Sequence, residues 1–316
     1  MSNISSEKIK SLREKTGAGI MDCKNALVEN NGEIENAIDW LRKKGIAKAN
    51  KKSSRTAAEG LVGVFSKNEM SCVIEVNSET DFVSKNKDFQ DFIEHLMQLA
   101  IKKEYSLEEF LLSKFDEDYN VQDALNNIIA KIGENIVIRR LTYLSLKTKK
   151  SKLGFYIHNK VTDNLGKIAC IVMGSFDADH ENIADLLKKI AMHISASKPL
   201  ALNENNLDNE LLNKERDILS EQLLNSGKKK DIIDKIVDGK LKKFISDITL
   251  LNQNWILEPK KNVSEVISEF NQEFNCNFEV LDYRLFVLGE GIETDTKDFK
   301  EEVASQLVDH LILQLL

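Results

Sequence analysis

This sequence of 316 residues lacks any long apolar segment, and the longest apolar run that we find is IACIVM, residues 168–173. A helix that crosses a bilayer needs roughly 20 apolar residues, so no membrane-spanning segment is predicted. The first residues, MSNISSEKIKSLREKTG, alternate polar and charged side chains where a secretory signal would need an unbroken apolar stretch. We therefore expect a cytoplasmic protein that does not bind membranes.

Cysteine and histidine are scarce and scattered. The four cysteines are Cys23, Cys72, Cys170 and Cys276, and no two of them form a CxxC pair. Isolated cysteines in apolar or mixed surroundings are typical of reduced, packed thiols. None of the five histidines has a partner at i+4 that would provide metal-ligand geometry. We expect no disulfide, no metal site and no cofactor.

An excess of positive charge is also absent, since 44 basic residues stand against 51 acidic ones for a net charge of −7. This balance gives no overall field that attracts phosphate backbones, so direct nucleic-acid binding is not expected. A local exception is RKKGIAKANKKSSR, with seven basic residues and no acidic one between Arg42 and Arg55. We interpret it as a solvated helix end and a tether, with a polyanion-binding patch as the alternative.

Known catalytic signatures fail when they are compared with the sequence residue by residue. Gly17 and Gly19 begin a dinucleotide-binding fingerprint, but Asp22 stands where the third glycine is required. Residues 195–198 match an SxxK tetrad, yet the accompanying KTG lies upstream at residues 15–17 and SDN is absent. Because no coherent nucleophile, base and orienting group is found, we do not expect an enzyme, although the fold could still assemble distant groups.

What is present begins with a compact helical segment. Three apolar stripes with helical spacing follow one another between residues 5 and 45. The stripes contain Ile9 and Leu12; Ile20, Cys23, Ala26 and Leu27; and Ile34, Ala37, Ile38 and Leu41. TGAG and NNG separate the stripes, and Gly45 stands where a C-terminal helix cap is expected. We predict a small three-helix bundle.

The next part of the chain contains the same order of predicted elements twice. LVGVFS and CVIEV flank the turn KNE as a hairpin, and a helix is expected to begin near Asp81, with Thr80 or Asp81 as its N-cap. GFYIHN, KIACIVMGS and ENIADLLKKIAMHI repeat this order. Each set ends in a later strand, ENIVIRRLTYLSL or FEVLDYRLFVL. We predict an α+β fold with two related subdomains and antiparallel sheets.

A helical insertion interrupts the second set between Pro199 and Trp255. Apolar residues at helical spacing fall on two stretches that NSGKKK joins. The residues of the two stripes are Leu207, Leu211, Ile218 and Leu223, then Ile232, Ile236, Leu241, Phe244 and Ile248. We predict an antiparallel helical hairpin, which needs a partner surface to bury its outer apolar residues.

These patterns divide the chain into five predicted parts. They are a three-helix domain with its basic tether (1–55), a first core subdomain (56–145), a second core subdomain (146–200 and 250–288), the inserted helical hairpin (201–249) and a C-terminal helical module (289–316). The sequence leaves open whether this last module docks on a partner or on the chain itself.

Several stretches coincide, in order, with one family. LREKTGAGIMDCKNAL, VNSETDFVSKN, KIGENIVIRR, MHISASKP, VDGKLKKF and WILEP closely resemble the motifs of bacterial elongation factor Ts. The resemblance runs from about Leu12 to the end of the chain. It implies an N-terminal domain of the ubiquitin-associated (UBA-like) type, two related core subdomains, an inserted hairpin and a short C-terminal helical module.

Members of this family are guanine-nucleotide exchange factors for elongation factor Tu. The resemblance implies that the chain binds elongation factor Tu, with GDP or without nucleotide, and promotes GDP release. The complex would be one-to-one, or two-plus-two through the helical hairpin. Asp81 and Phe82 would be presented to the partner's GTPase domain, where the ring inserts beside the magnesium site. From the residues alone, the alternative is that Phe82 staples the following helix to its own core.

The resemblance also assigns further partner contacts. The full set is Arg13, Met21, Lys24, Thr80, Asp81, Phe82, Val83, Ile132, Gly133, His158, Ile256 and Leu257. From the residues alone, Met21 and Ile20 could equally belong to the core of the bundle. Ile132 is expected to be core as well as interface, and His158 alone would be read as a surface strand residue. The chain departs from the family at Ile20, where a methionine is frequent, and in a longer hairpin around residues 157–167. A binding module without exchange activity is the remaining alternative, and a GDP-sensitive complex with elongation factor Tu would separate the two.

Overall fold

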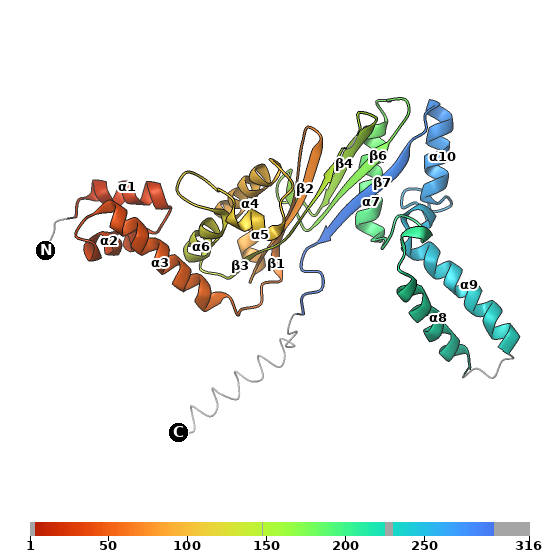
Figure 1. Cartoon of the computed structure of the whole chain (residues 1–316), viewed down its shortest axis with the longest axis horizontal. Helices are drawn as coiled ribbons and strands as arrows, with labels where there is room; N and C mark the ends of the chain where they lie inside the picture. Colours follow the sequence, from red (N-terminus) through yellow and green to blue (C-terminus); the bar gives the residue numbers. More distant parts are fainter. Residues whose placement is uncertain (1–3, 147, 225–229, 294–316) are drawn as a thin grey trace, which may run out of the picture.

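The structure is a computed structural model that describes residues 4–146, 148–224 and 230–293. Three N-terminal helices lie at one end, two β-sheets occupy the middle, and a pair of long helices projects beyond them (Figure 1). In these three ranges no helix is both long enough and apolar enough to cross a membrane. The predicted α+β class with antiparallel sheets is confirmed.

The first three helices form the predicted bundle. They are α1 (Ser6–Thr16), α2 (Ile20–Glu29) and α3 (Ile34–Lys52). Gly17 ends α1 at φ 65°, a left-handed conformation that glycine adopts without strain, and its N–H donates to the Arg13 carbonyl at 2.8 Å. Their shared core contains Leu12, Cys23, Ala26, Leu27, Ala37 and Leu41. Ile20 is 56% exposed, so its predicted place in this core is wrong, and the buried stripe of α2 begins at Cys23.

Helix α3 continues through the segment that was expected to be a cap and a tether. Gly45 is buried inside the helix, where a Cβ atom would lie 3.5 Å from the Asn127 side chain of α6 (Val121–Ile132). A Cβ atom at this distance would make an ordinary van der Waals contact, so Gly45 lies within the interface of the two helices. Arg42 pairs with Asp123 of α6 at 2.6 Å. The predicted cap at Gly45 is therefore wrong. The expected helix end is present, but it packs on α6 and extends to Lys52, so a tether can begin only after that residue.

The first sheet unit follows α3. Its strands are β1 (Glu59–Lys67), β2 (Met70–Ser78) and β3 (Ile136–Ser145), and its helices are α4 (Lys87–Ala100), α5 (Leu107–Leu112) and α6. The strands pair in the order β3-β2-β1, and the two-residue strand β5 (Leu165–Gly166) adds to β1 from the following unit. The largest fully buried side chains include Phe89 of α4 and Phe110 of α5, which pack on one face of this sheet.

The second sheet unit has the same order of strands and helices. It contains β4 (Ser151–His158), β6 (Ile168–Ser175), α7 (Ile183–Ser197), α10 (Val263–Phe274) and β7 (Glu279–Val287). The strands pair in the order β4-β6-β7, which corresponds to β1-β2-β3. A register shift interrupts the pairing of the middle strand with the last strand in both units, between Glu75 and Val76 and between Met173 and Gly174.

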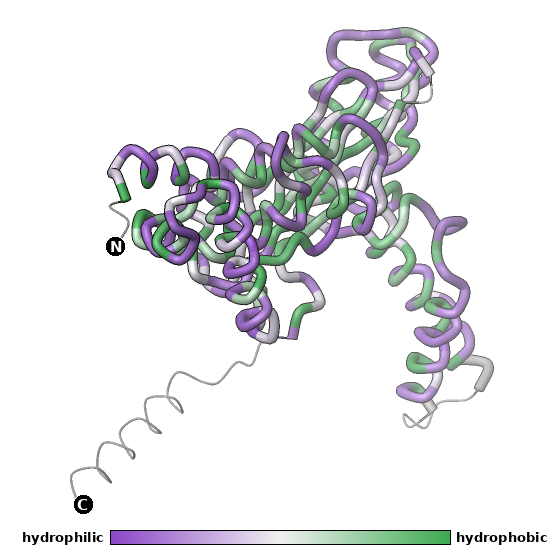
Figure 2. The backbone as a smooth tube through the Cα atoms, turned by 60° about the vertical axis from the view of Figure 1, so that its left-hand side comes forward, coloured by the Kyte–Doolittle hydropathy of each residue, from purple (hydrophilic) through white to green (hydrophobic). Residues whose placement is uncertain are grey.

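The two units also share a core between their sheets. This core contains Val62, Val64, Val73, Leu144, Ile157, Ala169, Ile171, Met173 and Phe286. The middle strands β2 and β6 therefore bury one face under the helices of their own unit and the other face against the second sheet, which explains their nearly continuous apolar runs. In Figure 2 the apolar segments gather in the central strands, whereas the helices at both ends alternate between hydrophilic and hydrophobic positions.

The inserted helices form the predicted antiparallel hairpin. They are α8 (Asn209–Leu224) and α9 (Lys230–Ile248). The residues of their seam are Leu219, Leu223, Ile233, Val237, Leu241 and Ile245. The predicted stripe on the second helix is therefore wrong in register, since Ile236 and Phe244 are only partly buried, and Ile218 is exposed on the first helix. Residues 294–316 of the predicted C-terminal module lie outside the described residues.

Candidate partner-binding site

The Phe82 ring is 74% exposed although it lies between two well-packed elements. It belongs to a short 3-10 helix, η1 (Asp81–Lys85), which separates β2 from α4. The neighbouring Val83 side chain is only 4% exposed and packs in the core of the first unit. Val83 therefore anchors the junction, and the alternative in which Phe82 packs into its own core does not hold in this structure.

The N-cap of the following helix is not where it was expected. Asn86 caps α4, since its side-chain oxygen accepts the N–H groups of Asp88 at 2.9 Å and Phe89 at 3.4 Å. Thr80 stands before η1 but makes no capping bond with its side chain. The prediction of a cap at Thr80 or Asp81 is wrong because η1 occupies five residues that were expected to begin the helix.

Two carboxylates join this junction to the segment between α6 and β3. The Glu134 carboxylate accepts the Thr80 N–H at 2.9 Å and the Thr80 hydroxyl at 2.7 Å. In return, the Glu79 carboxylate accepts the Asn135 N–H at 2.5 Å, and Arg55 donates to both Glu79 oxygens at 3.3 Å. We call these two carboxylates and their partners the clasp. It brings together segments that lie more than fifty residues apart in the sequence.

The other side of η1 is held as firmly. The Ser84 hydroxyl donates to the Asp81 carbonyl at 2.5 Å, and the Gln90 side chain donates to the Ser84 carbonyl at 2.9 Å. The Asn86 N–H donates to the Val83 carbonyl at 2.9 Å. Phe82 is thus presented from a backbone that is fixed both before and after the ring.

Residues Ile132 and Gly133 lie at the clasp. Gly133 ends α6 at φ 90° and is exposed, and the Lys52 ammonium at the end of α3 donates to its carbonyl. Ile132 is half-buried against the core of the first unit. Of the predicted contact residues, the structure therefore gathers one set around the clasp. This set is Thr80, Asp81, Phe82, Val83, Ile132 and Gly133.

His158 is separate from this set. It ends β4 with an exposed side chain, and its Nδ1 lies 3.2 Å from the Tyr156 hydroxyl. The two side chains line a hollow of about 290 Å³ together with Met192 and Lys198 of the α7 end. Ser195 of the SxxK match is buried, and its hydroxyl donates to the Ala191 carbonyl of its own helix at 2.9 Å.

Ile256 and Leu257 lie on a loop that a buried histidine holds. His193 Nδ1 accepts the Ile256 N–H at 3.3 Å, so Nε2 carries the proton and donates to the Gln253 side-chain oxygen at 3.1 Å. Its ring stacks on Trp255 with 5.2 Å between centroids. Burial lowers the pKa of His193 below its usual value and keeps it neutral. Leu257 remains 52% exposed on this loop.

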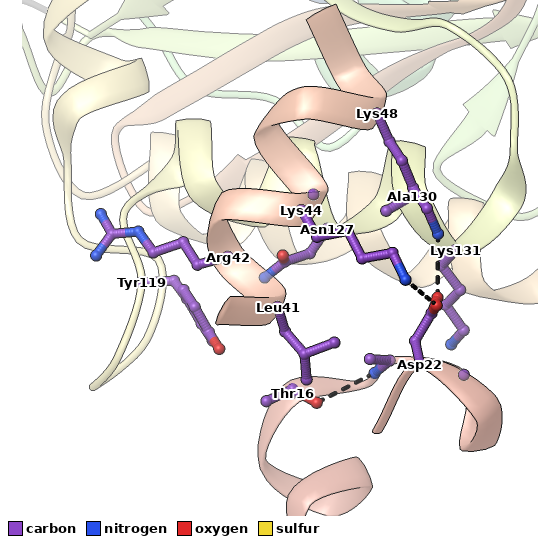
Figure 3. Close-up of a pocket in the computed structure, with 13 residues that line it drawn as sticks. Thr16, Asp22, Leu41, Arg42, Lys44, Lys48, Tyr119, Asn127, Ala130 and Lys131 are labelled. Carbon is purple, nitrogen blue, oxygen red and sulfur yellow. Dashed lines mark hydrogen bonds and ion pairs between the residues drawn. The ribbon is translucent and has the colours of Figure 1, made fainter. Parts of the chain in front are cut away.

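The predicted N-terminal contacts are all exposed. Met21 is 64% exposed, so it does not belong to the bundle core, and Arg13 and Lys24 are exposed as well. Asp22, which follows Met21 in the sequence, pairs with Lys44 at 2.9 Å and with Lys48 at 3.0 Å, as Figure 3 shows.

These ion pairs stand at a small cavity between the bundle and α6. The hydrogen bond from Lys44 holds the pKa of Asp22 below its usual value, with Lys48 contributing to the same shift. The cavity has a volume of only about 40 Å³, and Figure 3 shows Asn127 and Lys131 of α6 beside it. A cavity of this size is the space left between two packed helices, and it does not indicate a ligand site.

Reactive groups are held in unreactive states in the described part of the chain. All four cysteines are buried, and burial raises the pKa of Cys72 to about 12. Within those same residues, no three His, Cys, Asp or Glu side chains lie together as possible metal ligands. The exposed features that stand out are instead apolar side chains on rigid supports, which is the arrangement of a protein-binding surface.

Sequence reasoning missed the residues that hold this surface in place. Arg55, Glu79, Glu134 and Asn135 have no signature of their own, because carboxylates and amides are common in exposed loops. The only signal of Glu79, Glu134 and Asn135 is that they flank the predicted residues in SETDFV and KIGEN, whereas Arg55 has only its place at the end of the basic segment 42–55.

Comparison with known proteins agrees with this geometry. A sequence model of the family described as Elongation factor TS matches residues 79–290. Elongation factor Ts of Rhizobium etli is 42% identical over 306 residues, which cover 96% of this chain and 99% of the relative. The proteins of the same name from Rickettsia prowazekii and Bartonella bacilliformis are 42% and 41% identical over 96% of the chain and cover 97% and 98% of the relatives. The chain therefore belongs to the elongation factor Ts family.

Proposed function

We propose that this chain acts in translation elongation as a guanine-nucleotide exchange factor for elongation factor Tu. Membership of the elongation factor Ts family supports the role, and the exposed Phe82 ring on a rigid junction is the observation that carries it. The partner would be bound both with GDP and without nucleotide. An exchange factor performs no covalent chemistry, so the proposal requires only a surface that binds one conformation of the partner better than another.

The Phe82 ring and the Asp81 carboxylate would act on the magnesium site of the partner. Mg²⁺ requires nearly ideal octahedral oxygen geometry, so a small displacement of its ligands weakens it. A ring that inserts beside this site stabilises a conformation in which the nucleotide and the ion are poorly held. By linkage, bound GDP must then weaken the binding of the exchange factor by the same factor.

The free energy gained when the ring is buried limits what Phe82 can contribute alone. Burial of one phenylalanine contributes about 1.5–3 kcal/mol. Since a tenfold change corresponds to about 1.4 kcal/mol, the ring accounts for roughly one to two powers of ten in release rate. Further coupling would come from the other proposed contacts. They are Arg13, Met21 and Lys24 on the bundle, His158 at the end of β4, and Ile256 and Leu257 on the loop before α10, and all of them are exposed except the half-buried Ile256.

The substitution Phe82→Ala tests the proposal directly. We expect it to slow stimulated GDP release severalfold to about a hundredfold, because the burial energy of the ring is lost. The ring is exposed, so thermal unfolding should be unchanged. Release of a fluorescent GDP analogue from purified elongation factor Tu, chased with unlabelled GDP, measures the rate.

A matched control is Leu112→Ala. Leu112 is 75% exposed on α5, and it is not among the predicted contacts. This variant should stimulate release as well as the unmodified chain does. Equal rates for the Phe82→Ala variant and the unmodified chain would refute the role of the ring. No stimulation by the unmodified chain would refute the exchange function itself.

A further inference from the structure

We propose that Glu134 is a positioning residue for the Phe82 ring, and that its bonds to Thr80 hold the ring ready for insertion into the partner. The inference rests on the proposed function, and it assigns a task to a residue that is not among the proposed partner contacts. The carboxylate uses both of its oxygens on one residue, the backbone N–H and the hydroxyl of Thr80. Thr80 is only two residues before Phe82.

Glu134 is the main restraint on the segment that precedes the Phe82 ring. Thr80 has an extended backbone and no capping bond of its own to η1. Its carbonyl accepts the Ser78 hydroxyl at 2.9 Å, but its two donors both point to Glu134. Bonds to an ionised carboxylate are stronger than neutral ones. Loss of Glu134 would therefore leave both donors of Thr80 without an acceptor and loosen the chain just before the ring.

The second sheet unit provides an internal comparison for the clasp. There the Asp177 carboxylate accepts the Asn277 N–H at 2.7 Å and the Asn277 side-chain N–H at 2.6 Å. Asn277 stands two residues after the left-handed residue that ends α10, as Asn135 stands two residues after Gly133. The half of the clasp formed by Glu79 and Asn135 is thus repeated, which indicates that it serves the fold.

The other half of the clasp is not repeated. Cys276 occupies the place of Glu134, and Ala178 occupies the place of Thr80, so neither the carboxylate nor the hydroxyl is present. At the place of Phe82 stands His180, whose ring packs on Phe274 with 4.3 Å between centroids. The Glu134–Thr80 bonds therefore occur only in the unit where the ring is exposed and held away from its own core.

The clasp also reaches the N-terminal bundle. Arg55 follows α3 and pairs with Glu79, and the Asn135 side chain donates to the Arg55 carbonyl at 2.7 Å. Lys52 donates to the Gly133 carbonyl one residue before Glu134. The ring is thus held in one frame with the end of α3, which keeps two of the proposed contact regions in a fixed relation.

The experiment separates positioning from binding. Stimulated release of the fluorescent GDP analogue is measured with the full chain over a range of concentrations, which yields a saturating rate and a half-saturating concentration. We expect Glu134→Ala to lower the saturating rate about tenfold, because a misplaced group loses much of its effect. The half-saturating concentration should change by less than about twofold, since the remaining contacts are kept.

A double-mutant cycle gives a readout that a merely structural role would not change. If Glu134 acts through the ring, Glu134→Ala should have no further effect when Phe82→Ala is already present. An equal loss in both backgrounds would overturn the proposal. So would a Glu134→Ala variant that releases GDP at the unmodified rate while Phe82→Ala is slow. Failure of the unmodified chain to stimulate release would instead reject the exchange function.

Two conservative variants and one control complete the test. Thr80→Ser keeps both donors, whereas Thr80→Val keeps the shape but loses the hydroxyl, so we expect the valine variant to release GDP about threefold more slowly than the serine variant. Equal rates for this pair would count against the proposal, and the pair remains decisive if Glu134→Ala fails to fold. Asp177→Asn alters the repeated half in the other unit and should leave the rate unchanged.

Discussion

The two sheet units are built alike, but their middle strands differ at one buried position. In each unit a register shift follows this point, after Glu75 in β2 and after Met173 in β6. A buried carboxylate thus occupies the place that a methionine fills in the other unit, although the strand order is the same. The fold of one unit therefore does not require a charge at this position.

The carboxylate serves contacts between the units. Glu75 is fully buried and accepts bonds from Arg139 at 3.1 Å and from Arg140 at 2.5 Å. It also accepts the Gly289 N–H at 2.8 Å, and Arg140 donates to the Val287 carbonyl at 2.9 Å, both at the end of β7. Features that occur in both units build the fold, whereas features that occur once join the units or present a surface.

The largest effect is expected when Glu75 is replaced by methionine, the residue at the corresponding place of β6. Glu75→Met gives β2 the residue of β6 and leaves Arg139, Arg140 and the Gly289 N–H without their acceptor. Because one partner of a buried ion pair is lost, we expect a destabilisation of about 3 kcal/mol or more. Urea unfolding followed by circular dichroism measures it.

The matched control exchanges the methionine in the second unit. Met173→Leu conserves volume in an apolar core and should cost less than about 1.5 kcal/mol. If Glu75→Met cost no more than this control, the carboxylate would have no role in joining the units.

Much of the fold could be predicted from the sequence. Apolar periodicity located the hairpins, the helices after them and the inserted hairpin, because each of these elements buries one face. The errors arose where tertiary contacts override local signals. Gly45 resembles a helix end, but it is buried inside α3 where that helix packs on α6, and this contact is not visible in a single segment.

The candidate site was predictable only in part. Phe82 could be singled out, since a large ring between a strand and a helix in a polar stretch is unusual. Whether the ring faces inward or outward depends on Val83 and on η1, which no local pattern announced. Glu134 could not be found, because its partner Thr80 lies 54 residues away and forms no motif with it.

The residues that cap the C-terminal ends of α6 and α10 also differ between the units, and a smaller effect on stability is expected there. Gly133 has φ 90° and Asn275 has φ 47°, so both are left-handed, but only one is glycine. A Cβ atom on Gly133 would meet nothing within 4 Å, so Gly133→Ala tests backbone strain alone. We expect a loss of about 1–2 kcal/mol. Asn275→Gly removes such strain and should change stability by less than about 1 kcal/mol.

Thermal unfolding of the two variants distinguishes these outcomes. Gly133→Ala should lower the midpoint, and Asn275→Gly should leave it nearly unchanged or raise it slightly. A Gly133→Ala variant as stable as the unmodified chain would show that the end of α6 relaxes into another conformation. In that case the frame that holds Ile132 and Glu134 would be less rigid than the bonds at the clasp indicate.

The smallest effect concerns the two histidines on corresponding helices. His95 of α4 is exposed, whereas His193 of α7 is fully buried between Trp255 and Gln253. The imidazole of His193 accepts the Ile256 N–H, and a protonated ring could not accept it. Burial lowers the pKa of His193 in the folded chain below the ordinary value of 6.5.

This shift makes the stability of the second unit depend on pH in one direction. Above pH 6.5 His193 is neutral in both states, and its full contribution to stability is present. As the pH falls below that value the unfolded chain binds a proton first, so stability decreases until the pH passes the lowered folded pKa. Each unit of pKa difference corresponds to about 1.4 kcal/mol. Urea unfolding between pH 7.5 and roughly pH 5 should show this slope, and His193→Gln should remove it. An unchanged slope in the His193→Gln variant would assign the pH dependence to other groups. Asp22 and Asp177 do not account for it, because their pKa values are lowered from 3.8 and their contributions are lost only in more acidic solution.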